Sequence, residues 1–246
     1  MSKVLVNFIQ DRSGSMASAW EETLSGYRAF VDDLRQKSYG TDVEYLFSLT
    51  TFDTLVETPI VAARIGEVDV DELKKHGPRG MTALYDAVGI TIKNTEDNPQ
   101  GAEKIIVVIV TDGQENSSRE WSKEKLNKAI DMKLGLGNWT FTYLGTQPET
   151  WDDAAKIGVG AGSTRSYQPS MARAAYTTTA GAIHGMSVSK LTGSRSLMDD
   201  FADDDEATLA GMKKGPVSVR PAPEPPESKS PKPENQMNQS QVNRWR

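Results

Sequence analysis

Apolar and polar residues follow two different periods along most of the chain. Residues 4–9 form a short apolar run that ends in polar residues, which indicates a buried strand followed by a loop. Between Trp20 and Leu34 the apolar residues recur at spacings of four, three, four and three, which is typical of one face of an amphipathic helix. Residues 42–53 and 54–66 are rich in β-forming residues and predict a hairpin.

The strongest strand signal is the run at residues 104–110, in which six of seven residues are isoleucine or valine. Such a run is typical of a central parallel strand that is buried on both faces. Strand and helix patterns continue to alternate, with helices expected at 83–97, 120–134, 149–157 and 171–191 and strands at 139–145 and 164–168. This alternation predicts the α/β class: a three-layer α/β/α arrangement around a doubly wound, mostly parallel sheet with one antiparallel edge strand.

The composition changes towards the C-terminus and divides the chain into three parts. Residues 1–193 carry the alternating pattern and predict one folded domain. Residues 194–215 hold an acidic cluster and indicate a linker or a short helix. Residues 216–246 hold most of the 12 prolines and few large apolar residues, so they cannot bury enough apolar surface to fold alone. We expect this last part to be a disordered or extended tail.

Several classes of function are disfavoured by the composition. The chain has no cysteine and only two histidines, which excludes disulfides and thiolate zinc sites and favours oxygen ligands for any metal. A net charge of −6 without a basic stripe gives no support for nucleic-acid binding. The sequence has no apolar run long enough to cross a membrane and no secretory signal at its start, so we expect a cytoplasmic protein without a membrane partner.

Three polar loops lie next to the predicted elements. Residues 11–15 follow the first strand, residues 111–113 follow the strand at 104–110, and residues 77–82 lead into a helix. In an open α/β sheet, ligands bind where loops leave the carboxyl ends of the strands. Together these loops offer two carboxylates and three hydroxyls. The candidate metal ligands are Asp11, Ser13, Ser15, Thr82 and Asp112.

These five side chains suit a hard divalent cation. Mg²⁺ prefers six oxygen ligands in a nearly octahedral shell and often keeps some of its waters. Two carboxylates only balance the charge of a divalent ion, and hydroxyls add none, so the ion would stay electrophilic and could accept an external anionic oxygen. Mn²⁺ and Ca²⁺ stay open as alternatives to Mg²⁺. Taken singly, each loop is also compatible with a helix cap or a plain turn.

The order of the three loops resembles that of the von Willebrand factor A domain, and the resemblance covers residues 3–190. The family pattern is Asp-x-Ser-x-Ser after the first strand, Gly-x-Thr before a helix and Thr-Asp-Gly after an apolar strand. Those three loops form the metal ion-dependent adhesion site of the family. The chain carries the three motifs in the same order, at residues 11–15, 80–82 and 111–113.

The resemblance also implies roles for the candidate ligands. Ser13 and Ser15 would bind the metal directly, whereas Asp11, Thr82 and Asp112 would bind it directly or through water. An aspartate or glutamate of a partner protein would fill the open position on the metal. Further residues in or beside the same loops are expected to rim the site and to contribute to partner specificity, namely Arg12, Met16, Arg79, Gln114 and Glu115.

The leading hypothesis is a non-enzymatic, Mg²⁺-dependent protein-interaction module for adhesion or assembly. The chain is similar to bacterial and phage-encoded members of the family, some of which work beside AAA+ ATPases, so such an ATPase is a candidate partner. A second hypothesis is a structural subunit of a larger assembly, such as a virion, that uses its tail as an arm. A third is a metal-dependent hydrolase, which is disfavoured because no general base is evident beside the site and residues 11–15 lack the second aspartate of a phosphatase loop.

The acidic cluster at residues 199–206 leaves two interpretations open. It can be a solvated linker. It can also supply a carboxylate to the metal site of its own chain or of a neighbouring copy, because a tethered ligand reaches an effective concentration in roughly the millimolar range. The second interpretation would lead to self-association.

Overall fold

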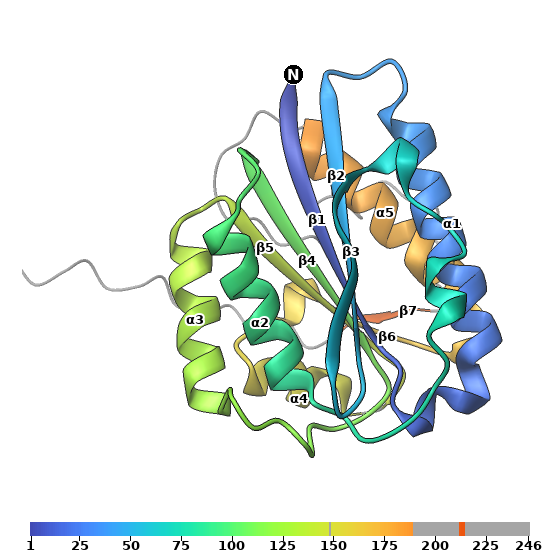
Figure 1. Cartoon of the computed structure of the whole chain (residues 1–246), viewed down its shortest axis with the longest axis vertical. Coiled ribbons are helices and arrows are strands. Elements are labelled where there is room, and N and C mark those ends of the chain that lie inside the picture. Colours follow the sequence, from blue (N-terminus) through green and yellow to red (C-terminus); the bar gives the residue numbers. More distant parts are fainter. Residues whose placement is uncertain (148, 189–211, 215–246) are drawn as a thin grey trace, which may run out of the picture.

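The computed structural model describes residues 1–147, 149–188 and 212–214, which form a layered α/β structure around one sheet (Figure 1). The strands lie in the order β3-β2-β1-β4-β5-β6-β7, so the first strand of the chain lies well inside the sheet. Their bounds are β1 (Ser2–Asp11), β2 (Val43–Phe52), β3 (Val56–Arg64), β4 (Lys104–Thr111), β5 (Trp139–Gly145), β6 (Thr164–Tyr167) and β7 (Met212–Lys214).

The inner strands β2, β1, β4, β5 and β6 run parallel to one another. At one edge, β3 is antiparallel to β2. This arrangement confirms the predicted doubly wound, mostly parallel sheet with an antiparallel edge strand. It also places the carboxyl ends of the parallel strands together, at the lower end of the sheet in Figure 1.

The sequence pattern does not predict β7, a second antiparallel strand at the opposite edge, where it pairs with β6. A linker or a short helix is predicted for residues 194–215, and within that range residues 212–214 form β7. A strand of three residues has too few positions to show a period, and it forms where the edge of β6 offers unpaired backbone groups. The rest of 194–215, the boundary at residue 193 and the tail at 216–246 lie outside the described residues.

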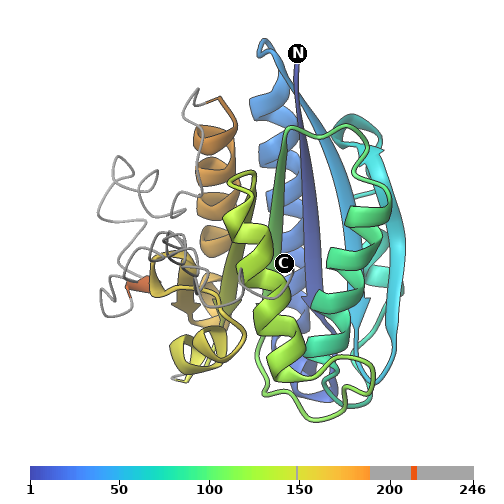
Figure 2. The ribbon, with the colours of Figure 1, turned by 90° about the vertical axis from the view of Figure 1, so that its left-hand side faces the viewer.

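Helices cover both faces of the sheet, and Figure 2 shows α1 and α5 on the side opposite to α2. Among the described residues, no helix is both long enough and apolar enough to span a membrane. One face carries α1 (Trp20–Ser38) and α5 (Ala172–Val188), and the other carries α2 (Leu84–Asp97), α3 (Lys123–Gly135) and α4 (Thr150–Lys156). Short 3-10 helices complete the connections: η1 (Gly14–Ala19), η2 (Ile65–Glu67), η3 (Glu72–Lys75), η4 (Ala161–Ser163) and η5 (Pro169–Met171).

The core on the α1 and α5 face is centred on Phe8 of β1. Its ring centroid lies 4.8 Å from that of Phe30, 5.8 Å from that of Tyr27 and 5.7 Å from that of Tyr176. Such aromatic pairs add to the free energy gained by burying large rings. Gly26 allows α1 to approach α5, because a Cβ atom there would lie 2.9 Å from the Tyr176 ring. Both helices therefore hold the middle of β1 in place.

Strand β4 is buried on both faces, as its apolar run predicts. Ile106, Val108 and Val110 belong to the core beneath α1 and α5, whereas Val107 and Ile109 belong to the core beneath α2 and α3. All five side chains are at most 1% exposed. The strand is thus a fixed parallel neighbour for β1, and the two strands end at the same level.

Strand β3 is less regular than the inner strands. Its pairing with β2 shifts register between Phe47 and Leu49 and again between Leu49 and Thr51. Pro59 lacks a backbone donor. Ala62 has a positive φ of 45°, which is unusual for a residue with a Cβ atom.

Helix α3 begins later than the sequence pattern predicts. It begins at Lys123, and the Ser122 side chain caps it by accepting a hydrogen bond from the Lys125 N–H at 3.2 Å. The residues just before it form a loop instead. In that loop, Asp86 of α2 accepts hydrogen bonds from the backbone N–H groups of residues 119–121. The predicted earlier start is therefore wrong.

Gly89 of α2 lies against Trp121, and a Cβ atom there would sit 2.0 Å from the indole ring. We expect Gly89→Ala to displace Trp121 and to lower the free energy of unfolding by about 1–3 kcal/mol, although alanine is favoured over glycine in a helix by about 1 kcal/mol. Urea unfolding followed by circular dichroism measures the change. Gly135→Ala is the control, because nothing lies within 4 Å of that position. An equal loss of stability in the two variants would contradict the packing argument.

Candidate metal site

The parallel pairing of β1 with β4 brings the ends of these two strands to one edge of the sheet. Gln10 pairs with Val110, so Asp11 and Thr111 follow at the same level. The Thr111 hydroxyl donates a hydrogen bond of 2.6 Å to Asp11 Oδ2, and the Ser13 N–H donates one of 2.6 Å to Asp11 Oδ1. Asp11 is completely buried. The protein thus fixes the directions of both carboxylate oxygens.

The loop after β1 turns through η1 and brings two hydroxyls to the same place. The Met16 N–H donates to the Ser13 carbonyl at 3.0 Å, which closes the turn. Ser13 Oγ lies 3.1 Å from Ser15 Oγ, and Ser15 Oγ donates to Asp112 Oδ1 at 2.7 Å. Hydrogen bonds therefore connect four of the five candidate ligands, namely Asp11, Ser13, Ser15 and Asp112.

Thr82 completes the group from the segment just before α2. Its N–H donates to Asn116 Oδ1 at 2.8 Å, and its carbonyl accepts from the Asn116 N–H at 3.0 Å. Gly113 shows how closely the oxygens converge. A Cβ atom placed on it would lie 3.3 Å from Thr82 Oγ1, 3.6 Å from Ser15 Oγ and 4.0 Å from Asp11 Oδ2. The structure thus brings all five predicted residues together at one point.

The spacing of these oxygens fits the coordination shell of a small hard cation. In an octahedron with metal–oxygen distances of about 2.1 Å, neighbouring oxygens lie about 3.0 Å apart. The observed separations are 3.1 Å between the two serine hydroxyls and 2.7 Å between Ser15 Oγ and Asp112 Oδ1. All the donors are oxygens, which Mg²⁺ prefers. The donor set and its spacing therefore fit Mg²⁺.

The two carboxylates of the site have no cationic partner among the described residues. Burial raises the pKa of Asp11 to about 6, although hydrogen bonds from Thr111 and Ser13 act in the opposite direction. Burial also raises the pKa of Asp112. Within the described residues, no lysine, arginine or histidine forms a salt bridge with either aspartate. A divalent cation would supply the missing positive charge.

The hydroxyls are essential to this donor set. In the part of the chain that the structure describes, no three or more side chains of histidine, cysteine, aspartate and glutamate gather into a group that could hold a metal. A cation at this point would therefore find two carboxylates at most among the described residues. Serine, threonine and water would have to complete its shell.

Known structures share this fold, although no family model and no curated protein matches the sequence. One of them is described as von Willebrand factor type A from Catenulispora acidiphila. It is 16% identical, the match covers 75% of this chain and 43% of that chain, and the TM-score is 0.57. The chain has the von Willebrand factor A fold.

Two further matches are proteins of bacterial pili. The pilus adhesin SpaC from Lactobacillus rhamnosus GG is 12% identical, with 76% of this chain and 31% of that chain covered and a TM-score of 0.60. The PilB minor pilin from Streptococcus sanguinis is 13% identical, with 75% and 61% covered and a TM-score of 0.55. This chain spans less than two thirds of the length of each matched protein. At such identities the matches show the von Willebrand factor A fold alone.

The rim residues differ from the sequence-based expectation. Arg12 and Met16 are predicted to contribute to partner specificity, but both are buried, so that prediction is wrong for them. Glu115 is half-buried, and its carboxylate accepts hydrogen bonds from three backbone N–H groups, which gives it a structural role. Arg79 and Gln114 are exposed at this end of the von Willebrand factor A fold.

Two residues that shape the site are missed by the sequence pattern. Thr111 orients Asp11, and Asn116 holds Thr82 through both its side chain and its backbone. Thr111 could have been found from its place between an apolar strand and Asp112. Asn116 gives no such signal, because it lies 34 positions from Thr82 in the sequence.

The raised pKa of Asp11 makes the stability of the metal-free protein depend on pH. The folded state binds the Asp11 proton more tightly than the unfolded chain, in which the pKa is 3.8. Well below that pKa the residue is neutral in both states and its burial costs little. As the pH rises from about 4 through about 6, the folded state loses about 3 kcal/mol relative to the unfolded state.

We therefore expect Asp11→Asn to raise the free energy of unfolding by about 1–3 kcal/mol in EDTA at about pH 8 and to give little or no gain below about pH 4. Urea unfolding at the two pH values measures this difference. Added Mg²⁺ should make the wild type more stable than the variant at the higher pH, because the ion binds and stabilises only the wild type. If Asp11→Asn is less stable than the wild type in EDTA at the higher pH, then burial of the charged Asp11 carboxylate does not destabilise the metal-free protein.

Proposed function

We propose that this chain is a non-enzymatic, Mg²⁺-dependent protein-interaction module whose metal binds an acidic residue of a partner protein. The observation that carries the proposal is the convergence of five oxygen-bearing side chains at the carboxyl ends of β1 and β4, at spacings that suit an octahedral ion. Two of the matched structures, a pilus adhesin and a minor pilin, agree with a role in adhesion or assembly. The proposed ligands are Asp11, Ser13, Ser15, Thr82 and Asp112.

The donor set leaves room for a partner. An octahedral ion has six positions, and five protein residues leave at least one for an external oxygen. The two carboxylates only balance the charge of the ion, and the three hydroxyls add none. The site therefore has no net negative charge to repel another carboxylate, and the ion can still accept one. Gly14 and Ser15 are exposed, which gives a partner access from solvent.

Hydrolysis is the less favoured alternative. A metal-activated water needs a general base within hydrogen-bond reach. The two histidines of the chain are engaged elsewhere: His76 lies close to Glu72 and Glu57, and His184 forms a hydrogen bond with Tyr45. Within the described residues, neither imidazole contacts a candidate ligand. The described surroundings of the site therefore favour binding over turnover.

The partner is defined by its chemistry, as a protein that presents an accessible aspartate or glutamate. An AAA+ ATPase in the cytoplasm and a neighbouring copy of this chain are two candidates. In the second case the acidic cluster at 199–206 would provide the carboxylate. That cluster lies outside the described residues. A structural role in a larger assembly would use the same metal site.

Isothermal titration calorimetry with MgCl₂ tests the metal site directly. We expect saturable binding by the wild type and a loss of affinity of at least about tenfold for Ser15→Ala, which removes one ligand from an exposed turn. Ser18→Ala is the matched control, because Ser18 is exposed in the same 3-10 helix and is not a candidate ligand. Equal affinities of the wild type and Ser15→Ala would exclude Ser15 as a ligand.

Partner capture tests the second half of the proposal. The immobilised wild-type chain should retain a partner from an extract in Mg²⁺ and release it in EDTA, because the metal bridges the two proteins. Ser15→Ala should fail to retain it, and so should the wild type when the partner's contacting carboxylate is changed to an amide. Retention that is indifferent to EDTA would overturn the proposal.

A further inference from the structure

Asp53 contacts two of the three loops that form the metal site, the first metal loop (residues 11–15) and the second metal loop (residues 77–82). We propose that Asp53 is the positioning residue of the site. It holds the two loops together, and it helps to neutralise Arg12, a buried arginine that lies between two of the proposed ligands in the sequence. The inference rests on the proposed function, because it concerns the same metal ion.

Asp53 is itself held rigidly, in the turn between β2 and β3. Phe52 at the end of β2 pairs with Asp11 at the end of β1, so Asp53 follows beside the first metal loop. The Asp53 N–H donates to the Leu55 carbonyl at 3.0 Å, and Asp53 Oδ1 accepts from the Leu55 N–H at 2.8 Å. The residue is only 2% exposed. Its second carboxylate oxygen, Oδ2, contacts an arginine in each of the two metal loops.

The second metal loop is fastened to Asp53 on both sides of Thr82. Before Thr82, Arg79 Nε donates to Asp53 Oδ2 at 2.8 Å. After Thr82, the Ala83 N–H donates to the Asp53 carbonyl at 2.9 Å. The side chain and the backbone of one residue therefore determine where Thr82 lies.

The neighbouring residue, Thr54, adds a third attachment. Thr54 Oγ1 accepts a hydrogen bond from the Met81 N–H at 3.0 Å. Gly80 has a φ of +67°, and a Cβ atom there would lie 2.8 Å from Thr54 Oγ1, so glycine permits this close approach. The turn between β2 and β3 thus supports the second metal loop along its length.

The same Asp53 oxygen reaches the first metal loop through Arg12, whose Nη2 lies 3.2 Å from Asp53 Oδ2. Backbone hydrogen bonds join the two loops directly at this point. The Arg79 N–H donates to the Arg12 carbonyl at 2.8 Å, and the Gly14 N–H donates to the Gly80 carbonyl at 3.2 Å. Asp53 Oδ2 therefore lies where the two metal loops meet.

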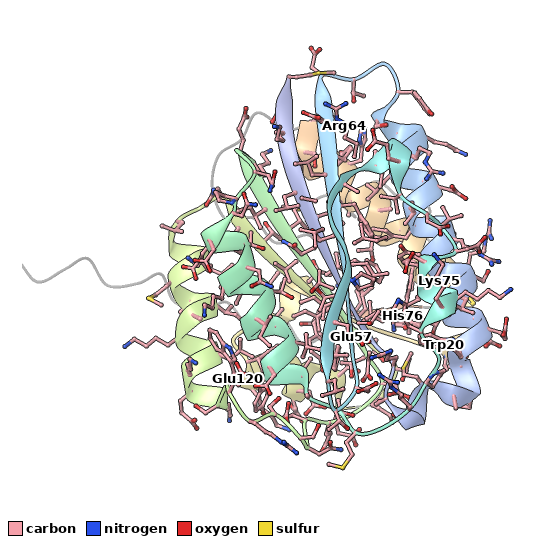
Figure 3. The ribbon with its side chains drawn as sticks, in the orientation of Figure 1. Trp20, Glu57, Arg64, Lys75, His76 and Glu120 are labelled. Atoms are coloured by element: carbon pink, nitrogen blue, oxygen red, sulfur yellow. The ribbon has the colours of Figure 1, made fainter. Side chains whose placement is uncertain are left out.

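The charge of Asp53 matters as well as its hydrogen bonds. Arg12 lies between two proposed ligands in the sequence and is 3% exposed, so its guanidinium is a buried positive charge in the first metal loop. It also forms a salt bridge with Glu57, which Figure 3 shows on β3 next to His76. Asp53 and Glu57 share the neutralisation of Arg12, so the loss of Asp53 would leave part of the guanidinium charge uncompensated in a place where water screens it poorly.

The carboxyl group of Asp53 is ionised at neutral pH. Burial alone would raise its pKa, but hydrogen bonds from Arg79 and Leu55 and the charge of Arg12 lower it below the usual value. Asn at this position would keep the shape of the side chain and remove the charge. Asp53→Asn therefore tests the positioning role with little change in volume.

Asp86 provides the matched comparison. Among the described residues it is the only other buried carboxylate outside the proposed ligands. It accepts hydrogen bonds from three backbone N–H groups, at residues 119–121, which carry no ligand. Asp53→Asn and Asp86→Asn should both lower the free energy of unfolding. Only the first should also weaken metal binding.

Isothermal titration calorimetry of the whole chain with MgCl₂, below the unfolding temperature of each variant, separates the two roles. We expect Asp53→Asn to raise the dissociation constant for Mg²⁺ by at least about tenfold, and Asp86→Asn to change it by less than about threefold. Arg79→Gln changes an exposed residue and removes the salt bridge between the second metal loop and Asp53. It should raise the dissociation constant for Mg²⁺ by about threefold or more.

A folded Asp53→Asn variant that binds Mg²⁺ as tightly as the wild type would overturn the inference and leave the proposed metal site standing. If Asp53→Asn does not fold, Arg79→Gln decides the question, and an unchanged affinity of that variant has the same consequence. A wild-type chain that does not bind Mg²⁺ would overturn both the inference and the proposed function.

Discussion

The hydrogen bond from the Thr111 hydroxyl to Asp11 joins the ends of two strands inside the sheet. It forms because β1 and β4 are parallel and in register, so the polar residues after each apolar run arrive at the same level. The bond holds a carboxylate where burial penalises its charge. Within the described residues no cationic side chain offsets that penalty, and the hydroxyls around it are arranged as the shell that a cation would complete.

The loop that carries Thr82 shows how a site is assembled from distant parts of a chain. On one side it is fastened to Asp53 and to the loop after β1, and on the other Asn116 holds both the N–H and the carbonyl of Thr82. These side-chain contacts join residues that lie 26 and 34 positions apart. Helix α2 only sets where the loop ends, and tertiary contacts set where the hydroxyl lies. A group of oxygens held in this way would need little reordering to accept the proposed ion.

The sheet and the candidate ligands could be predicted because both leave local signals in the sequence. The apolar run at 104–110 marks a strand buried on both faces, and each candidate ligand lies at or near a predicted strand end or helix start. Asp53 gives no such signal, since aspartate in a hairpin turn usually serves the turn alone. Arg12 is misleading because a charged residue in a polar loop is normally exposed. Its burial depends on carboxylates of the β2–β3 hairpin, which sequence spacing does not place near it.

The irregular edge of the sheet affects how copies of the molecule meet. A straight edge strand exposes unpaired backbone groups and can add a strand from another chain, which leads to aggregation as readily as to recognition. In β3, Pro59 lacks a donor, Ala62 turns the backbone into the left-handed region, and the register shifts twice. At the opposite edge, β7 has only three residues. Within the described residues, neither edge therefore offers a long regular template for the addition of a strand from another chain.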